Sequence, residues 1–193
     1  MADVPRGVIP NQGERLRAAL AKRRRVRRRL ATGAAAAAAI GLALAPLLWP
    51  RRPLLVWNAS ASSPRGLYRV EPPGGLEVGD MAVAWPPAGA RSLAAARGYL
   101  PANVPLVKRV AAVAGDSVCA RGAALFVNGR AAAMRRGRDP LGRTLPHWRG
   151  CRALGPGEFL LLSRGAAGAF DGRYFGPVGR RQVVGRATPL WTW

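Results

Sequence analysis

The chain has 193 residues, a formal net charge of +22 at pH 7 and a sequence pI of about 12.0. This length allows one domain of ordinary size plus an appendage. So strong a positive charge would normally indicate a nucleic-acid partner. The basic residues are almost all arginine, however, and they occur along the whole chain without the alternating aromatic residues of a base-stacking surface. We therefore expect no nucleic-acid partner, whereas a basic surface that faces anionic lipid headgroups is compatible with the composition.

The N-terminal region has the pattern of a membrane anchor. Residues 1–29 form a basic tail that ends in Lys22–Arg29, where seven of the eight residues are charged. The next stretch, Leu30–Pro50, has 21 residues and no charge, which is enough for a helix to cross a hydrocarbon core of about 30 Å. Trp49 suits the membrane interface, and Pro50 suits the end of a helix.

Charge around this span predicts its orientation. The stronger basic cluster precedes the span, and Arg51 and Arg52 follow it. The positive-inside rule therefore predicts a cytoplasmic tail over residues 1–29, a transmembrane helix over 30–50 and an extracytoplasmic domain over 53–193. A cleaved signal peptide is the competing interpretation, but the apolar run is long for one and begins late. We favour an uncleaved anchor.

Residues 53–193 have the pattern of a mainly β, antiparallel domain. Short apolar runs, separated by Gly and Pro, lie at Leu67–Val70, Met81–Trp85, Leu106–Ala114, Ala124–Val127, Phe159–Leu162 and Gln182–Val184. We expect turns at Pro72–Gly75 and Gly155–Gly157, and Asn128–Gly129 after an apolar run is a β-hairpin signal. Ala88–Leu100 is expected to form one short helix.

The stretch Trp57–Val70, WNASASSPRGLYRV, holds the first candidate catalytic groups. Ser60, Ser62 and Ser63 lie within four residues of one another. A hydroxyl that attacks a carbonyl needs a rigid, exposed backbone. The proline that follows restricts the residue before it to extended conformations, and Gly66 permits a turn. Taken alone, the stretch is more typical of an ordinary loop that leads into a strand.

The chain has two lysines, Lys22 and Lys108, and one histidine, His147. A buried lysine can lose its proton, whereas arginine effectively cannot, so Lys108 is a candidate general base for a serine. On a strand, the apolar residues Leu106 and Val110 would share its side. The alternative role for Lys108 is a surface cation. A Ser–His–Asp triad would need His147, which lies in a segment that we expect to be a mobile appendage.

Two cysteines, Cys119 and Cys151, permit one disulfide outside the cytoplasm. It would close an Arg- and Gly-rich insertion over residues 120–150 that lacks a core of its own. Closing a loop of this length is worth about 3–4 kcal/mol in the chain-entropy model. Two free buried thiols are the alternative. No metal site is expected, because the chain has a single histidine.

Three segments follow one another in the order NASASSPRGLYR, VPLVKRVAAVAGDSVC and FDGRYFGPVGRRQVVGRATPLWTW. In this order they resemble the serine–lysine signal peptidases (family S26), and within them the conjugative-transfer, TraF-type branch that matures pilin subunits. The resemblance covers Trp57–Trp193. It implies a signal-peptidase-like fold and a serine endopeptidase without a cofactor. It also implies a membrane-borne precursor, such as a pilin, as substrate, and a bacterial inner-membrane location with the catalytic domain in the periplasm.

By this resemblance Ser62 is the nucleophile and Lys108 is the general base. Ser63 is the rival nucleophile, at a position where the family commonly carries an apolar residue. The hydroxyl of Ser60 and the backbone N–H of Ser62 would form the oxyanion hole. The substrate would lie extended along a strand edge.

Asp171 and Arg173 match the family's structural carboxylate and its partner, although an ordinary turn ion pair of little energy is the alternative. The family usually places a hydroxyl residue two positions before this aspartate, where it orients the lysine, and here that residue is Ala169. Gly172 also stands where serine is frequent. Another group, such as Ser163 or a backbone carbonyl, could hold the lysine instead.

Two other functions remain open at this point. If the site is weakened, the protein would be a catalytically weak assembly component of a conjugation or secretion apparatus. Ala169 is the residue that suggests this function. The positive charge leaves a membrane-tethered nucleic-acid-binding module as the third possibility, which would show steeply salt-dependent DNA binding.

Overall fold

The computed structural model describes residues 12–48, 53–165 and 168–193. The chain divides into two compact units, Met1–Arg51 and Arg52–Trp193.

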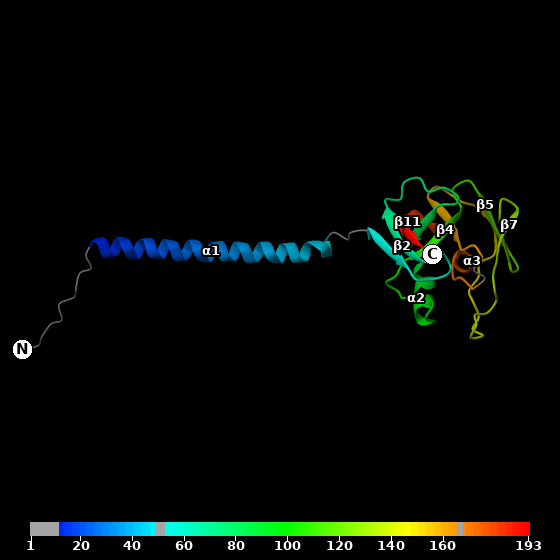
Figure 1. Ribbon diagram of the computed structural model, residues 1–193, viewed down its shortest axis with the longest axis horizontal. Helices are drawn as coiled ribbons and strands as arrows, with labels where there is room; N and C mark the ends of the chain where they lie inside the picture. The colour runs from blue at the N-terminus through cyan, green and yellow to red at the C-terminus, as the bar shows by residue number, and fades with distance from the viewer. Residues whose placement is uncertain (1–11, 49–52, 166–167) are drawn as a thin grey trace, which may run out of the picture. The chain divides into compact units, whose positions relative to one another are not determined.

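The first unit contains one long helix, α1 (Gln12–Leu48), which is drawn from blue to cyan in Figure 1. Its stretch Leu20–Ala45 is long and apolar enough to cross a membrane. The helix begins well before the expected span, because arginine and alanine are both good helix formers. Residues 1–11 of the expected tail, and Trp49–Arg52 at the expected end of the span, lie outside the described residues.

The second unit is mainly β, as expected, and all its strand pairs are antiparallel. Its larger sheet has the order β1-β2-β11-β3-β4-β9-β10. These strands are β1 (Leu55–Asn58), β2 (Gly66–Glu71), β3 (Met81–Ala84), β4 (Leu106–Ala112), β9 (Glu158–Leu162), β10 (Val178–Gly179) and β11 (Val183–Thr192). The last strand in the sequence, β11, therefore lies inside the sheet, between β2 and β3, and Figure 1 shows it beside β2.

A second sheet forms from the insertion and has the order β7-β6-β5-β8. Its strands are β5 (Ser117–Arg121), β6 (Ala124–Val127), β7 (Arg130–Met134) and β8 (Gly150–Ala153). Val118, Ala120 and Leu125 of this sheet pack in one cluster with Leu160 and Leu162 of β9. The insertion has no core of its own, as expected, but the expectation of an appendage was wrong, because the insertion packs against residues of the larger sheet.

The turn and helix expectations were largely correct. Asn128 and Gly129 join β6 to β7 with φ values of 49° and 76°, as a type I′ hairpin turn requires. Helix α2 (Ala88–Ala96) is shorter than the expected Ala88–Leu100, and α3 (Gly172–Phe175) is an additional single turn. Gly98, with φ at 71°, follows the end of α2.

Alternate residues of the central strands face opposite sides of the larger sheet. Ala82 of β3 and Val110 of β4 belong to one apolar cluster, whereas Val83 and Val107 belong to another. Because successive side chains of a strand alternate between faces, Lys108 shares its side with Val110. The expected environment of Lys108 on an apolar strand is thus present.

Close packing fixes the start of β2. Gly66 has φ at 141°, and a Cβ atom at this position would lie 1.9 Å from the carbonyl oxygen of Trp191. No other residue type fits there without a backbone shift, since a side chain would collide with main-chain atoms of β11. Gly66 thus allows the backbones of β2 and β11 to lie close together where β2 begins, directly after the serine loop in the sequence.

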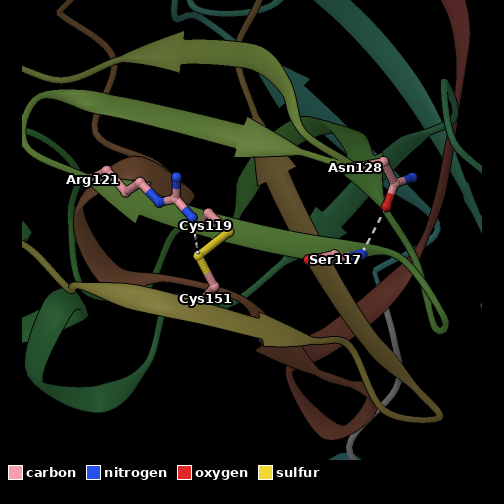
Figure 2. The surroundings of a disulfide bond; sticks show 5 residues. All are labelled: Ser117, Cys119, Arg121, Asn128 and Cys151. Carbon is pink, nitrogen blue, oxygen red and sulfur yellow. Dashed lines mark hydrogen bonds between the residues drawn. A yellow bond between two sulfur atoms is a disulfide. The ribbon is translucent and has the colours of Figure 1, made fainter.

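The predicted disulfide is present. Cys119 of β5 lies directly opposite Cys151 of β8, and their sulfur atoms are joined, as Figure 2 shows. The Arg121 side chain donates to Cys151 Sγ at 3.7 Å, and at the other end of β5 the Ser117 N–H donates to Asn128 Oδ1 at 2.8 Å. The bond staples the edge strand β8, whose residues are all exposed, to the centre of the small sheet.

We expect reduction of this disulfide to lower the free energy of unfolding by about 3–4 kcal/mol, because the unfolded chain regains the freedom of the closed loop. Urea unfolding with and without dithiothreitol measures the difference. The Cys119→Ser/Cys151→Ser variant is the control and should show no response to the reductant. A wild-type midpoint that is unaffected by dithiothreitol would contradict the prediction.

Candidate active site

The serine loop joins β1 to β2, and the buried amide of Asn58 organises it. Asn58 Nδ2 donates to the carbonyl oxygens of Ser60, Ser63 and Pro64 at 2.9–3.1 Å. Its Oδ1 accepts from the Ser60 N–H at 3.2 Å. The buried phenol of Tyr68 adds a second donor to the Pro64 carbonyl at 2.7 Å. These bonds give the loop the rigid backbone that a nucleophile needs.

Ser62 and Lys108 are brought together by this loop and by β4. Lys108 Nζ and Ser62 Oγ form a hydrogen bond. Lys108 is 4% exposed, whereas Ser62, its partner on the serine loop, is accessible to solvent. Opposite Lys108 on β3 is the small residue Ala82, which leaves room for the lysine stem. The two residues that the sequence suggested as a dyad are therefore in direct contact.

Burial changes the chemistry of this amine. Desolvation lowers the pKa of Lys108 from 10.5 to about 8, with Asp171 opposing the shift and Arg173 adding to it. At neutral pH about one lysine in ten is then uncharged, against fewer than about one in a thousand for a solvated lysine. A neutral amine in contact with a hydroxyl is a competent proton acceptor.

Ser60 lies beside the candidate nucleophile, as predicted. Ser60 Oγ and Ser62 Oγ are 2.7 Å apart, and Ser60 Oγ accepts from the Ser62 N–H at 3.2 Å. Both expected oxyanion donors are thus adjacent and exposed to the groove. They are bonded to each other in this arrangement, so an incoming oxyanion would have to replace that contact.

Ser63 has a different partner. Its hydroxyl donates to the carbonyl oxygen of Val107 at 2.8 Å, which ties the serine loop to β4 one residue before Lys108. The hydroxyl of the rival nucleophile is therefore engaged in holding the loop, and Ser62 is the serine that faces the amine.

Asp171 and Arg173 form a buried ion pair at the start of α3. Arg173 Nε donates to Asp171 Oδ1 at 2.9 Å, and the two side chains are 4% and 0% exposed. Asp171 Oδ2 also accepts from the Ser163 N–H, and Arg173 donates to the Ser163 carbonyl. The pair thus holds the end of β9, next to the strand that carries Lys108.

Gly172 and Ala169, the two residues that depart from the expected pattern, differ in their structural consequences. Gly172 is required here, because a Cβ atom would lie 2.7 Å from the Leu161 carbonyl oxygen. Ala169 is buried beside the site and lines the same groove as Ser62. No hydroxyl stands at this position to orient Lys108.

Ser62 and Lys108 open into a groove of about 940 Å³. The serine loop, the start of β4 and the segment that connects α2 to β4 all line it. The remaining lining comes from residues 136–145 and from Gly168–Phe170 with Tyr174. His147 is exposed and is not among the described residues that line this groove. An extended peptide can therefore reach the Ser–Lys pair but does not meet the histidine.

Metal-ligating residues do not gather anywhere in the described segments, which contain no group of three or more His, Cys, Asp or Glu side chains suited to an ion. The groove residues beside Ser62 offer hydroxyl, amine and apolar groups instead.

Sequence reasoning passed over Asn58 and Tyr68, although both hold the serine loop. The available signal was an asparagine just before a Ser- and Pro-containing turn, since asparagine side chains frequently bond to the backbone of the turn that follows. Its long reach to Pro64 depends on the folded loop and has no sequence signature.

Comparison with known proteins decides the family. The family model for signal peptidase, peptidase S26, matches residues 27–193. The chain belongs to this signal peptidase family. The match spans the serine loop, Lys108 and the Asp171–Arg173 pair, so the site described above lies within the family's own region.

Two curated relatives and one solved structure are similar to this chain. The plasmid transfer protein TraF of Escherichia coli is 37% identical over 70% of this chain and 82% of its own length. The probable conjugal transfer protein TraF of Sinorhizobium fredii is 33% identical over 70% of this chain and 76% of its own. A solved signal peptidase I from Enterococcus faecalis V583 is similar over 59% of this chain and 97% of its own, at 17% identity and a TM-score of 0.34.

We expect Arg173→Gln to lower the free energy of unfolding by about 3–5 kcal/mol, because Asp171 would remain as a buried charge without its partner. Arg152→Gln is the matched control. Its ion pair with Glu158 has side chains that are 46% and 32% exposed, so its loss should cost less than about 1 kcal/mol. Urea unfolding of the two variants checks the difference, and equal losses would contradict the prediction.

Proposed function

We propose that the protein is a membrane-anchored serine endopeptidase that uses Ser62 and Lys108 to cleave signal or pro-peptides of exported proteins. The observation that carries this proposal is the contact between the buried Lys108 amine and the Ser62 hydroxyl at the head of the groove. Membership of the signal peptidase family supports the reaction class. The names of the relatives, plasmid and conjugal transfer proteins, support a conjugative pilin subunit as the substrate.

The reaction begins when the neutral Lys108 amine takes the Ser62 hydroxyl proton as Oγ bonds to the scissile carbonyl carbon. The oxyanion that forms accepts hydrogen bonds from the Ser62 N–H and from the Ser60 hydroxyl, which turns away from its resting contact. The Lys108 ammonium then gives its proton to the leaving nitrogen as the C–N bond breaks.

An ester between Ser62 and the acyl part of the substrate remains. Water attacks this ester while Lys108 takes the water proton, and the proton returns to Ser62 Oγ as the acyl group leaves. Asp171 and Arg173 act at a distance by holding the end of β9 beside the lysine. The cycle ends with the neutral amine restored and needs no cofactor.

The membrane is the second proposed partner. Helix α1 contains a candidate single span, and the basic run Lys22–Arg29, which comes before the uncharged part of this helix, favours a cytoplasmic N-terminus by the positive-inside rule. The second unit would then lie in the periplasm of a bacterial inner membrane. The disulfide agrees with this placement, because such bonds persist outside the reducing cytoplasm.

An aromatic cluster on the second unit fits a lipid surface as well. Trp57, Trp191 and Trp193 are each more than half exposed, and their ring centroids are 5.0–6.2 Å apart. Tryptophan favours the membrane–water interface. This patch supports a role for the bilayer beyond a simple tether.

Ala169 favours one other function, that of a catalytically weak assembly component of a conjugation or secretion apparatus. Without the usual orienting hydroxyl, the lysine amine would be free to turn away from Ser62. In that case substitution of Ser62 would leave the biological role intact.

Cleavage of a membrane-borne pilin precursor separates these functions. We expect Ser62→Ala to lower the rate at least about a thousandfold, because the nucleophile is lost. Ser63→Ala is the matched control: its hydroxyl helps to hold the loop on β4 but does not contact the amine, so its loss should lower the rate far less than the loss of Ser62. A folded wild-type protein that cleaves no precursor would favour the assembly function.

The pH profile tests the base. We expect kcat/KM to rise about tenfold per pH unit below about pH 8 and to level off above it, because the neutral fraction of Lys108 follows this course. Lys108→Arg should be inactive throughout, since arginine stays protonated, while its circular dichroism spectrum remains that of the wild type. A rate that does not change between about pH 6 and pH 8 would contradict the assignment.

A further inference from the structure

The hydroxyl of Ser163 is buried and unpaired. Ser163 directly follows β9 and is 7% exposed. Within residues 12–48, 53–165 and 168–193, its Oγ is the one buried side-chain polar atom without a hydrogen-bond partner. A buried hydroxyl left unpaired is unfavourable, so its retention calls for a reason.

The backbone of Ser163, in contrast, is held on both sides. Its N–H donates to Asp171 Oδ2 at 2.8 Å, and its carbonyl oxygen accepts from Arg173 Nη2 at 2.9 Å. The buried ion pair thus fixes the position of this residue. The hydroxyl is the part of Ser163 that remains available for a partner.

Strand register places this hydroxyl beside the lysine. In the antiparallel pair of β4 and β9, Arg109 lies opposite Leu162 and Val110 lies opposite Leu161. One further step in the same register puts Lys108 opposite Ser163. Directly opposed residues point to the same face, with Cβ atoms about 4.5–5.5 Å apart. Ser163 is therefore the cross-strand neighbour of Lys108.

The other groups around the amine leave this place open. On the β3 side the neighbour of Lys108 is Ala82, which cannot hydrogen-bond through its side chain. The serine loop presents the Ser62 hydroxyl, which the amine already contacts. The charged groups that act on the amine are Asp171 and Arg173 at α3, and these bind each other.

We propose that the Ser163 hydroxyl, which has no partner in this structure, rotates to accept a hydrogen bond from Lys108 Nζ and orients the amine toward Ser62, in place of the hydroxyl that Ala169 lacks. Ser163 is then a positioning residue for the base, and this role rests on the proposed Ser–Lys function. A neutral amine has two N–H bonds and one lone pair, so fixing one N–H on Ser163 helps to aim the lone pair at the Ser62 proton. After proton transfer, the same bond holds the ammonium while another N–H faces the leaving nitrogen.

The sign of the effect on the lysine follows from the direction of this bond. The Ser163 oxygen stabilises the charged amine more than the neutral amine, because it accepts from the N–H. Ser163→Ala should therefore lower the pKa of Lys108 further and reduce kcat about 10- to 100-fold through misorientation of the lone pair. A residue that only supports packing would leave the Lys108 pKa in place.

The small number of lysines makes a direct test possible. In a Lys22→Arg background, ¹⁵N-lysine labelling of the full chain in detergent gives one side-chain amine signal, that of Lys108. Its titration by NMR is compared between this background, Ser163→Ala and the exposed control Ser92→Ala on α2. The kcat for precursor cleavage is measured on the same proteins and on Ser163→Ala/Ala169→Ser.

We expect Ser163→Ala to lower the Lys108 pKa and kcat, Ser92→Ala to change neither, and the added Ala169→Ser to restore both by returning a hydroxyl to the amine. A Lys108 pKa that is the same with and without the Ser163 hydroxyl overturns the proposal, whatever the rate does. If the pKa falls but no protein in the set cleaves precursor, the contact between hydroxyl and amine stands and the proposed peptidase function fails.

Discussion

The burial of the Lys108 amine is the constraint on which the rest of the second unit depends. The pKa of Lys108 falls from 10.5 to about 8 on folding, and at about 1.4 kcal/mol per pKa unit this corresponds to roughly 3 kcal/mol. Because the folded pKa is the lower one, the full penalty applies below about pH 8 and disappears above the unfolded value. At neutral pH the site therefore opposes folding, and the surrounding sheet must supply the stability.

Two features offset this penalty close to the lysine. The apolar clusters on the two faces of β3 and β4 fix the strand that carries Lys108. The buried pair of Asp171 and Arg173 fixes the end of β9 beside it. Neither the apolar clusters nor the ion pair needs to contact a substrate, and both fix the position of the Lys108 amine. The serine loop is then drawn to β4 by the bond from Ser63 to the Val107 carbonyl.

Residue chemistry, more than periodicity, made the site predictable from the sequence. A lysine kept among many arginines suggested a titratable amine, and its strand neighbours predicted its burial. Resemblance to the family then selected Ser62 over Ser63. The sequence could not show the contacts that Asn58 makes in the serine loop. It also could not show which of several possible groups is the partner of Lys108. Both depend on which strands pair and in which register.

The second sheet shows the limit of sequence reasoning about the fold. Strand β8 has no apolar run and is exposed throughout, and β5 has an apolar run of only three residues, so neither strand stands out in the sequence. The insertion was therefore expected to lack a core. Its few apolar residues suffice because Leu160 and Leu162 of β9 complete the cluster, and such sharing between sheets is not visible in a local pattern.

Strand order also determines when the larger sheet can form. β11 lies between β2, which follows the serine loop, and β3, which pairs with the strand that carries Lys108. Until residues 183–192 are available, no strand joins β1 and β2 to the rest of this sheet. The sheet is therefore complete only when nearly the whole unit is present, and the serine loop and Lys108 reach their final positions late in synthesis.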